Sequence, residues 1–232
     1  MESILAAFQQ ALSLIIHCDS ELLSIILLSF QVSGLALACS MAVGIPLGAL
    51  VSLTVFPGRN VIIALLQTLM GLPPVVVGLF LYLLLSRSGP LGFMSLLYSP
   101  TAMVIAQAIL SFPIVASLSH AAIVGVDPII RQAATTLGAT PLQVSVTIIK
   151  EARYGILSAI IAGFGRVMAE VGAVLMVGGN IAGYTRVMTT TIALETDKGN
   201  FELALALGII LLIIAMLVNL VLRAVQRQGR NV

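Results

Sequence analysis

Charged residues are scarce in this sequence. They account for 9% of its 232 residues, whereas hydrophobic residues account for 59%. A typical globular domain carries roughly 25% charged residues. A soluble domain would have too little polar surface to cover so much apolar surface. The composition therefore excludes an ordinary soluble protein and predicts an integral membrane protein.

Cysteine is equally scarce, since only Cys18 and Cys39 are present. Two cysteines do not make a disulfide framework, and no disulfide is predicted. Cys39 lies inside a long apolar block, where a free cysteine usually packs as a small hydrophobic residue, so we expect it to be buried. Residues 17–21 are expected to form a solvated linker and not a metal site, because neighbouring residues on a helix point in different directions.

Two further absences narrow the function. The sequence has no GxxxxGKS or GxxxxGKT loop, so it does not bind ATP by that route. An intramembrane enzyme would need a nucleophile with a base, or paired metal ligands, inside the spans. His120 is the only histidine within them, and we expect it to be a packed or hydrogen-bonded group. No catalytic residue, metal ligand or bound cofactor is predicted for this chain.

Five apolar blocks are long enough to cross a bilayer, which takes about 20 residues per helical pass. Apolar residues do not alternate with polar ones at period two, so the predicted fold class is all-α. The predicted transmembrane helices cover about residues 22–55, 60–86, 101–126, 154–177 and 201–225. The first is expected to be interrupted late, at Gly44, Pro46 and Gly48. Residues 86–100 and 180–200 are predicted to be loops.

The N-terminus carries a shorter apolar stripe, which predicts a helix lying on the membrane surface. It has no basic n-region and no cleavage signal of small residues, so we expect it to remain on the mature protein. The predicted organisation is therefore an interfacial helix and linker over residues 1–21, followed by one transmembrane domain over residues 22–232.

Residues 127–150 form a polar interval between two apolar blocks and carry two helix starts. Asp127 before Pro128 is typical of an N-cap with proline at the first helical position. Gly138 is placed to end that helix in the left-handed conformation. Thr140, Pro141 and Gln143 then have the spacing of a capping box. The sequence predicts a short amphipathic helix whose apolar stripe comprises Ile130, Ala133, Ala134 and Leu137.

Polar or helix-breaking residues stand inside two of the apolar blocks. Pro73 and Pro74 are adjacent in GLPPVVVG, which predicts a broken helix whose free backbone groups are covered by protein or line a water-filled cavity. The break has two interpretations, a lining of the pathway or a packing kink between helices. Arg166 and Glu170 are one turn apart in the fourth block. Each alone would cost about 3 kcal/mol at the bilayer centre, so we expect them to pair. The pair has two interpretations, an ion pair that fixes helix packing, which we favour, or part of a conduction path.

Basic residues predict the orientation, because cytoplasmic ends of membrane helices are enriched in lysine and arginine. With five spans, seven basic residues share one side and three share the other. The larger group comprises Arg59, Arg131, Lys150, Arg153, Arg223, Arg227 and Arg230, and the smaller comprises Arg87, Arg186 and Lys198. The N-terminus is therefore predicted outside, and the C-terminus and residues 127–150 in the cytoplasm.

These residues together resemble the membrane subunit of an ATP-binding-cassette (ABC) importer. The family's cytoplasmic signature is Glu-Ala-Ala, three residues, then Gly, and Gln132, Ala133, Ala134 and Gly138 match it except that glutamine replaces glutamate. The segments GLPPVVVG and GFGRVMAEVGAVLMVGGNIAGYTRVMTTTIALE are similar to molybdate and tungstate permeases. Lys150 and Glu151 stand where molybdate permeases usually have Leu-Pro, which favours the tungstate branch.

The resemblance implies a type I ABC importer permease fold with a cytoplasmic coupling helix, in a bacterial or archaeal inner membrane. Its implied partners are a second copy of the chain, two cytoplasmic ATPases that use ATP and Mg²⁺, and a periplasmic or extracellular oxyanion-binding protein; no nucleic acid is implied. The implied ATPase-coupling residues are Asp127, Gln132, Ala133, Ala134, Gly138, Ala139, Thr140 and Pro141.

An oxyanion pathway needs hydrogen-bond donors that bind weakly enough to release the ion. Candidate pathway residues are Pro73, Pro74, Arg166, Glu170 and the hydroxyls of Thr189, Thr190 and Thr191, which we expect near the outer mouth. A threonine-rich stretch is more often only a solvated turn.

Two alternatives differ in the driving force or the cargo. Molybdate or a sulfate-like oxyanion could replace tungstate. A gradient-driven secondary carrier would favour repeated halves and acidic relay residues, neither of which is evident.

Overall fold

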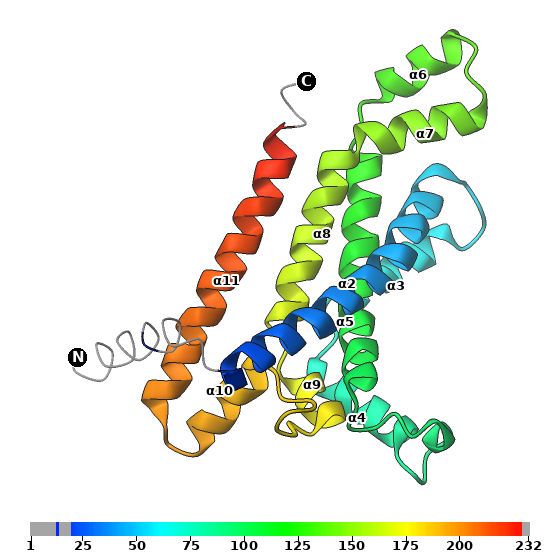
Figure 1. Ribbon diagram of the computed structural model, residues 1–232. Helices are drawn as coiled ribbons and strands as arrows, with labels where there is room; N and C mark the ends of the chain where they lie inside the picture. Colours follow the sequence, from blue (N-terminus) through cyan, green and yellow to red (C-terminus); the bar gives the residue numbers. More distant parts are fainter. Residues whose placement is uncertain (1–12, 14–19, 229–232) are drawn as a thin grey trace.

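The computed structural model describes residues 13 and 20–228, and regular structure within them is helical throughout. The interfacial helix predicted for residues 1–21 lies almost entirely outside the described residues. Figure 1 shows the order and arrangement of the helices. They are α2 (Ser20–Leu53), α3 (Arg59–Leu69), α4 (Pro74–Leu85), the short 3-10 helix η1 (Gly92–Met94), α5 (Pro100–Val124), α6 (Pro128–Thr136), α7 (Pro141–Glu151), α8 (Arg153–Met168), α9 (Gly172–Gly178), α10 (Met188–Asp197) and α11 (Phe201–Gln228).

Three helices in the described part of the chain are long and apolar enough to cross a membrane alone, and these are α2, α5 and α11. Two further spans arise if each bent pair counts as one, α3 with α4 at an angle of 101° and α8 with α9 at 56°. Five spans result when each bent pair counts as one span. This count confirms the prediction of about five spans in an all-α fold.

Helix α5 lies at the centre of the bundle and packs against both α2 and α8. Its neighbours approach through small residues. A Cβ on Gly48 of α2 would lie 2.6 Å from the carbonyl oxygen of Ala116, and one on Gly163 of α8 would lie 2.8 Å from the side chain of Val115. Glycine is therefore required at both positions for the observed spacing.

The interruption predicted in the first span is wrong, because α2 continues through Pro46 to Leu53. Gly44 and Gly48 serve the close contact with α5 and do not end the helix.

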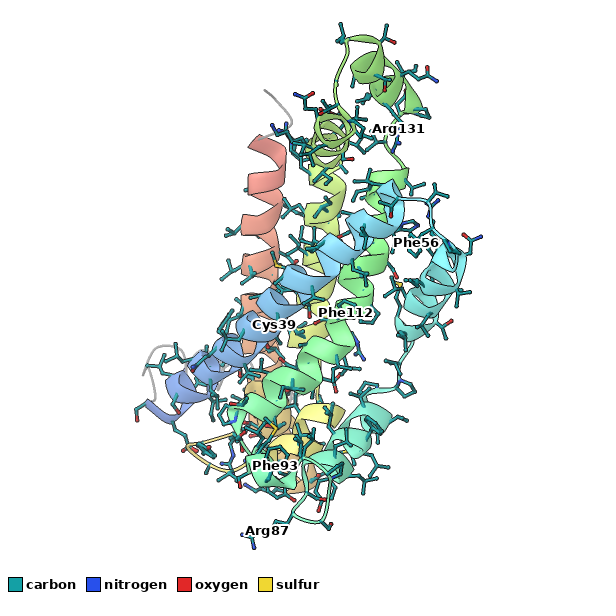
Figure 2. All side chains as sticks on the ribbon, turned by 90° about the vertical axis from the view of Figure 1, so that its right-hand side faces the viewer. Cys39, Phe56, Arg87, Phe93, Phe112 and Arg131 are labelled. Atoms are coloured by element: carbon teal, nitrogen blue, oxygen red, sulfur yellow. The ribbon has the colours of Figure 1, made fainter. Side chains whose placement is uncertain are left out.

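The burial predicted for Cys39 is also wrong, because Cys39 is exposed. The buried face of α2 includes Val32, Ala36 and Ser40 at four-residue spacing. Cys39 is one residue removed from that face, and Figure 2 marks its place on α2.

Two predictions for the C-terminal half need correction. The fourth span is not continuous to residue 177, because α8 ends at Met168 and α9 starts in a new direction at Gly172. Residues 180–200 are not simply a loop, because Met188–Asp197 form α10, which packs against α11. Both departures depend on contacts between distant segments, described below.

The bundle has two distinct ends in Figure 1. The α2–α3 connection, α6, α7 and the red C-terminal part of α11 lie at one end, and the α4–α5 and α10–α11 connections lie at the other. Arg59, Arg131, Lys150 and Arg153 belong to the first end, whereas Arg87 and Lys198 belong to the second. The helices thus segregate the basic residues as the five-span prediction requires.

Candidate functional site

The segment from Asp127 to Gln143 holds its shape through its own hydrogen bonds. The Asp127 carboxylate accepts a bond from the Ile129 N–H at 2.9 Å and caps α6. Thr140 and Gln143 form the predicted capping box, with the Thr140 N–H donating to the Gln143 side chain at 2.8 Å. Gly138 has φ of +79°, and its N–H donates to the Thr135 carbonyl at 3.0 Å. The predicted caps and the glycine terminus are confirmed.

The surface of α6 is largely uncovered, since every one of its residues is exposed or half-buried. Of the predicted apolar stripe, Ile130 and Ala134 are half-buried, whereas Ala133 is exposed. Ile129 is 66% exposed, and Leu137, just after the helix, is 87% exposed. Two large apolar side chains are therefore exposed on this short projecting segment.

Helix α7 anchors this segment to the bundle. Val144 and Ile148 are buried in one apolar cluster with Ile123 of α5 and Ile156 of α8. Ala134 and Ala139 pack against the same cluster. Among the predicted coupling residues, Asp127, Gln132, Gly138, Thr140 and Pro141 remain on the exposed side.

The predicted break at Pro73 and Pro74 is confirmed, because α3 ends at Leu69 and α4 begins at Pro74. Pro74 takes the first helical position, where its missing N–H leaves no bond unmade. A Cβ on Gly172, at the start of α9, would lie 3.1 Å from the Val75 side chain, and one on Gly78 would lie 2.9 Å from the Ala173 Cα. The two broken spans therefore bring the N-terminal ends of α4 and α9 together inside the bundle.

Arg166 and Glu170 form the predicted ion pair, with Nη1 and Oε2 3.2 Å apart. The Glu170 side chain is 2% exposed and that of Arg166 is 25% exposed. Glu170 Oε1 accepts a bond from the Ala173 N–H at 2.9 Å, and the Glu170 carbonyl accepts one from the Thr189 hydroxyl at 2.8 Å. Glu170 therefore caps α9, balances Arg166 and ties the break between α8 and α9 to α10.

The prediction that the three threonines lie in a loop is wrong. They belong to α10 and are buried, with exposed fractions of 8%, 0% and 7% for Thr189, Thr190 and Thr191. The Thr190 and Thr191 hydroxyls both donate to the Val187 carbonyl, at 3.0 and 2.8 Å. These hydroxyls satisfy the first turn of α10, so they are not free donors for an anion in this conformation.

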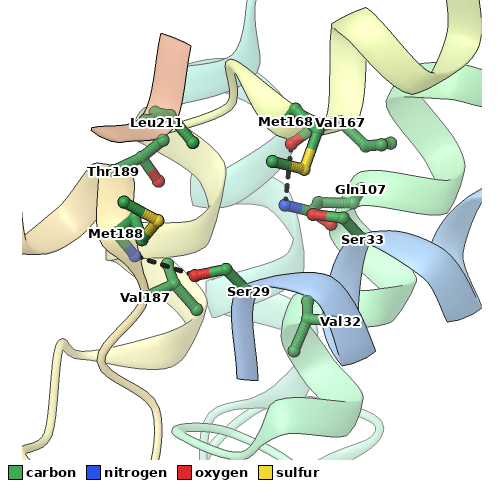
Figure 3. Close-up of a pocket in the computed structure, with 10 residues that line it drawn as sticks. All are labelled: Ser29, Val32, Ser33, Gln107, Val167, Met168, Val187, Met188, Thr189 and Leu211. Carbon is green, nitrogen blue, oxygen red and sulfur yellow. Dashed lines mark hydrogen bonds between the residues drawn. The ribbon is translucent and has the colours of Figure 1, made fainter. Parts of the chain in front are cut away.

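A small polar cavity lies beside this network, between α2, α5, α8 and α10 (Figure 3). Ser29, Ser33, Gln107 and Thr189 contribute its polar lining. Gln107 Nε2 donates to the Val167 carbonyl at 3.1 Å, while its buried Oε1 has no partner among the described residues. The cavity volume is about 10 Å³, roughly enough for one water molecule. The cavity therefore has room for a water molecule and not for an oxyanion in this conformation.

Sequence reasoning missed Gln107, Ser29 and Ser33 as residues of this region. The available signal was an amide in an otherwise apolar block, since a buried amide must find hydrogen-bond partners. His120, by contrast, is the hydrogen-bonded group that was expected, with its Nδ1 2.7 Å from the Ser52 hydroxyl oxygen.

No group of three or more histidine, cysteine, aspartate and glutamate side chains gathers among the described residues. His17, Cys18 and Asp19 lie outside them.

Residues 44–230 match the family described as the inner membrane component of binding-protein-dependent transport systems. The chain belongs to this family, and the predicted resemblance to ABC importer membrane subunits is confirmed. It is 42% identical over 228 residues to the tungstate uptake system permease protein TupB of Peptoclostridium acidaminophilum, covering 98% of this chain and 100% of that protein.

Two other relatives are permeases for an unspecified anion and for molybdenum. A probable anion ABC transporter permease protein of Haloferax volcanii is 44% identical over 203 residues, covering 85% of this chain and 88% of that protein. The molybdenum transport system permease protein ModB of Escherichia coli K12 is 34% identical over 218 residues, covering 89% and 94%. The relationship to the tungstate branch is therefore confirmed.

Solved structures support the same fold. An amino acid ABC transporter with histidines has a TM-score of 0.69 at 23% identity, covering 94% of this chain and 97% of that one. A bacterial ABC transporter that imports the acidic polysaccharide alginate also has a TM-score of 0.69, at 20% identity and with coverage of 90% and 80%. At these identities the likeness shows the fold alone.

Proposed function

We propose that this chain is the permease subunit of an ABC importer that takes up tungstate by ATP-driven alternating access. The observation that carries the proposal is the 42% identity to a tungstate permease along nearly the full length of both chains. Molybdate, or a sulfate-like oxyanion, is the second candidate cargo, favoured by the 34% identity to a molybdenum permease. A gradient-driven carrier fits poorly with membership in a binding-protein-dependent family.

Energy for transport comes from a partner subunit in this proposal. The exposed helix α6, with Ile129 and Leu137 uncovered, inserts into a groove of a cytoplasmic ATPase that uses ATP and Mg²⁺. Gln132 offers the ATPase a neutral hydrogen bond where the family usually has a glutamate. Docking therefore relies on shape, through Ala133, Ala134 and Gly138.

The proposed assembly contains two copies of this chain, two ATPases and a periplasmic or extracellular binding protein that delivers the oxyanion. The end that carries α6 faces the cytoplasm together with the C-terminus, and the N-terminus lies outside, in keeping with the basic residues at the α6 end. Closure of the ATPases moves α6, and the bundles rotate as bodies between outward-open and inward-open states.

The pathway of the oxyanion runs along the broken spans in this proposal. The N-termini of α4 and α9 carry the positive ends of their helix dipoles. Arg166, in the last turn of α8, adds a partly exposed cation. Glu170 offsets much of that charge. A weakly positive passage lets an anion enter and leave, so selectivity resides mainly in the binding protein.

The docking role of α6 is tested by Gly138→Asp. A Cβ at this position meets nothing within 4 Å among the described residues, so the added carboxylate projects into the docking surface. We expect ATP-dependent uptake to be lost while the subunit remains in the membrane. Gly138→Asn is the matched control, since asparagine tolerates the left-handed backbone without adding charge. Uptake at the normal rate by the Gly138→Asp variant would exclude the docking assignment.

The cargo is tested separately, by competition of labelled tungstate uptake with unlabelled molybdate and sulfate. We expect tungstate itself to compete best. Competition by molybdate that equals or exceeds competition by tungstate would refute the tungstate assignment and favour the molybdate alternative, with the coupling mechanism unaffected.

A further inference from the structure

A second cavity, of about 220 Å³, lies at the α6 end of the bundle. It is bounded by the last turn of α2, the start of α3, the end of α5, and α6 and α7. Its polar lining comprises Ser52, Arg59, Asp127 and Arg131, and the rest is apolar. Figure 2 marks Arg131 on α6 at the same end of the molecule as Phe56 of the α2–α3 connection. Two arginines from separate elements thus line one cavity.

Neither arginine is neutralised within the described part of the chain, where no carboxylate oxygen lies within 4.0 Å of Arg59 or Arg131. Arg59 Nε donates to the Val51 carbonyl at 2.7 Å, which fixes the guanidinium and leaves its terminal nitrogens available. The single carboxylate of the lining, Asp127, already accepts the Ile129 N–H as the cap of α6. The two guanidinium groups and the one carboxylate leave the lining with one net positive charge, which a bound anion would balance.

We propose that the Arg59–Arg131 cavity binds a phosphate-class oxyanion group. Guanidinium groups donate paired N–H bonds that match the geometry of phosphate oxygens. The cavity lies where α2 and α5 end, and basic pockets at the ends of membrane helices are suited to phospholipid headgroups. The ligand source is either such a phosphodiester headgroup or a free oxyanion.

The position of the site gives it a structural role. The elbow between α2 and α3 comprises residues 54–58, and Arg59 follows it as the first residue of α3. Arg131 lies in the projecting helix α6. One anion between them joins the elbow to α6, which are otherwise separate parts of this end. The proposal depends on the two arginines and the cavity and does not depend on which anion is transported.

The test uses the full-length chain, purified with its co-expressed subunits, in nanodiscs of two compositions. Discs of mixed phosphatidylglycerol and phosphatidylcholine are analysed by native mass spectrometry for retained phosphatidylglycerol. Discs of phosphatidylcholine alone are titrated with radiolabelled orthophosphate. The variants are Arg59→Gln, Arg131→Gln and their combination. Lys150→Gln is the matched control, since Lys150 is exposed at the same end and does not line the cavity.

We expect the unmodified chain and the Lys150→Gln variant to bind alike, and the double variant to lose about tenfold or more in binding, as for lost charge-assisted hydrogen bonds. Dependence on both arginines in the phosphatidylglycerol arm identifies a lipid headgroup, and the same dependence in the orthophosphate arm identifies a free ion. Equal binding by the double variant and the Lys150→Gln variant in both arms overturns the proposal. Arg131 is exposed and forms no side-chain bond within the described part of the chain, so the Arg131→Gln variant should fold normally. If the double variant misfolds, binding by Arg131→Gln equal to that of Lys150→Gln in both arms overturns the proposal.

Discussion

Replacing Glu170 by glutamine separates the two tasks of its carboxylate. The glutamine oxygen can still accept the Ala173 N–H that lies 2.9 Å from Glu170 Oε1, so the cap of α9 is retained. The negative charge that faces Arg166 across 3.2 Å is removed. The variant therefore leaves a guanidinium in the bundle without its counter-charge and changes little else.

The expected cost lies between two limits. Breaking a fully buried ion pair from one side costs about 3–5 kcal/mol, whereas an exposed pair contributes about 0–1 kcal/mol. Because Arg166 is 25% exposed and Glu170 only 2% exposed, we expect Glu170→Gln to cost about 2 kcal/mol. For a chain of this length that loss corresponds to a thermal midpoint lower by about 4–8 °C.

A double-mutant cycle tests this reasoning in purified full-length protein. Thermal midpoints are measured for Glu170→Gln, for Arg166→Met and for both together. We expect the double variant to lose less stability than the sum of the single variants, by about 0.5–3 kcal/mol. Additive losses would refute an energetic pairing. Normal oxyanion uptake by the double variant would limit the pair to packing, and loss of uptake without further loss of stability would place it in the pathway.

Three further outcomes follow from the packing and the capping. Gly48→Ala forces a Cβ to 2.6 Å from a backbone oxygen of α5, so it should lower stability by about 1–3 kcal/mol, as measured by the thermal midpoint. Gly34→Ala, which meets nothing within 4 Å in the described chain, should not lower the midpoint, since alanine is the better helix former. Thr140→Ala removes one half of the capping box and should cost about 1 kcal/mol and speed hydrogen exchange in α7, while unchanged exchange would contradict the role of the cap. The hydrogen bond from Lys198 lowers the pKa of the Glu195 carboxyl, so its stabilisation is present above the ordinary carboxyl pKa of 4.5 and is lost as the pH falls through the lowered value. Lys198→Met should reduce that acid-dependent loss, as measured by thermal midpoints across an acid pH series.

The features that sequence reasoning predicted well are those set by neighbouring residues. The two caps and the glycine terminus between Asp127 and Gln143 are formed within three or four positions of the chain. The break at Pro73 and Pro74 is equally local, because proline removes a backbone donor whatever surrounds it. The apolar blocks set the number of spans through composition alone.

The features that sequence reasoning missed depend on contacts between distant segments of the chain. The break between α8 and α9 has no proline, and it is stabilised by Glu170 together with Thr189 of another helix. The buried face of α2 is determined by the position of α5, so the exposure of Cys39 could not be read from an apolar block with little periodicity. The hydroxyls of Thr190 and Thr191 were expected to be available donors, but they bond to the Val187 carbonyl once α10 has formed. The Thr189 hydroxyl bonds instead to the Glu170 carbonyl of a distant segment.

The α6–α7 segment is held rigid by its own hydrogen bonds, and this rigidity has a mechanical consequence. Its caps and its glycine turn hold the angle between the two helices, and the side chains of Val144 and Ile148 are fixed between Ile123 of α5 and Ile156 of α8. A force applied to the tip of α6 is therefore not absorbed by bending within the segment. It reaches α5 and α8 as torque, and α8 carries it to the bend at which α9 begins.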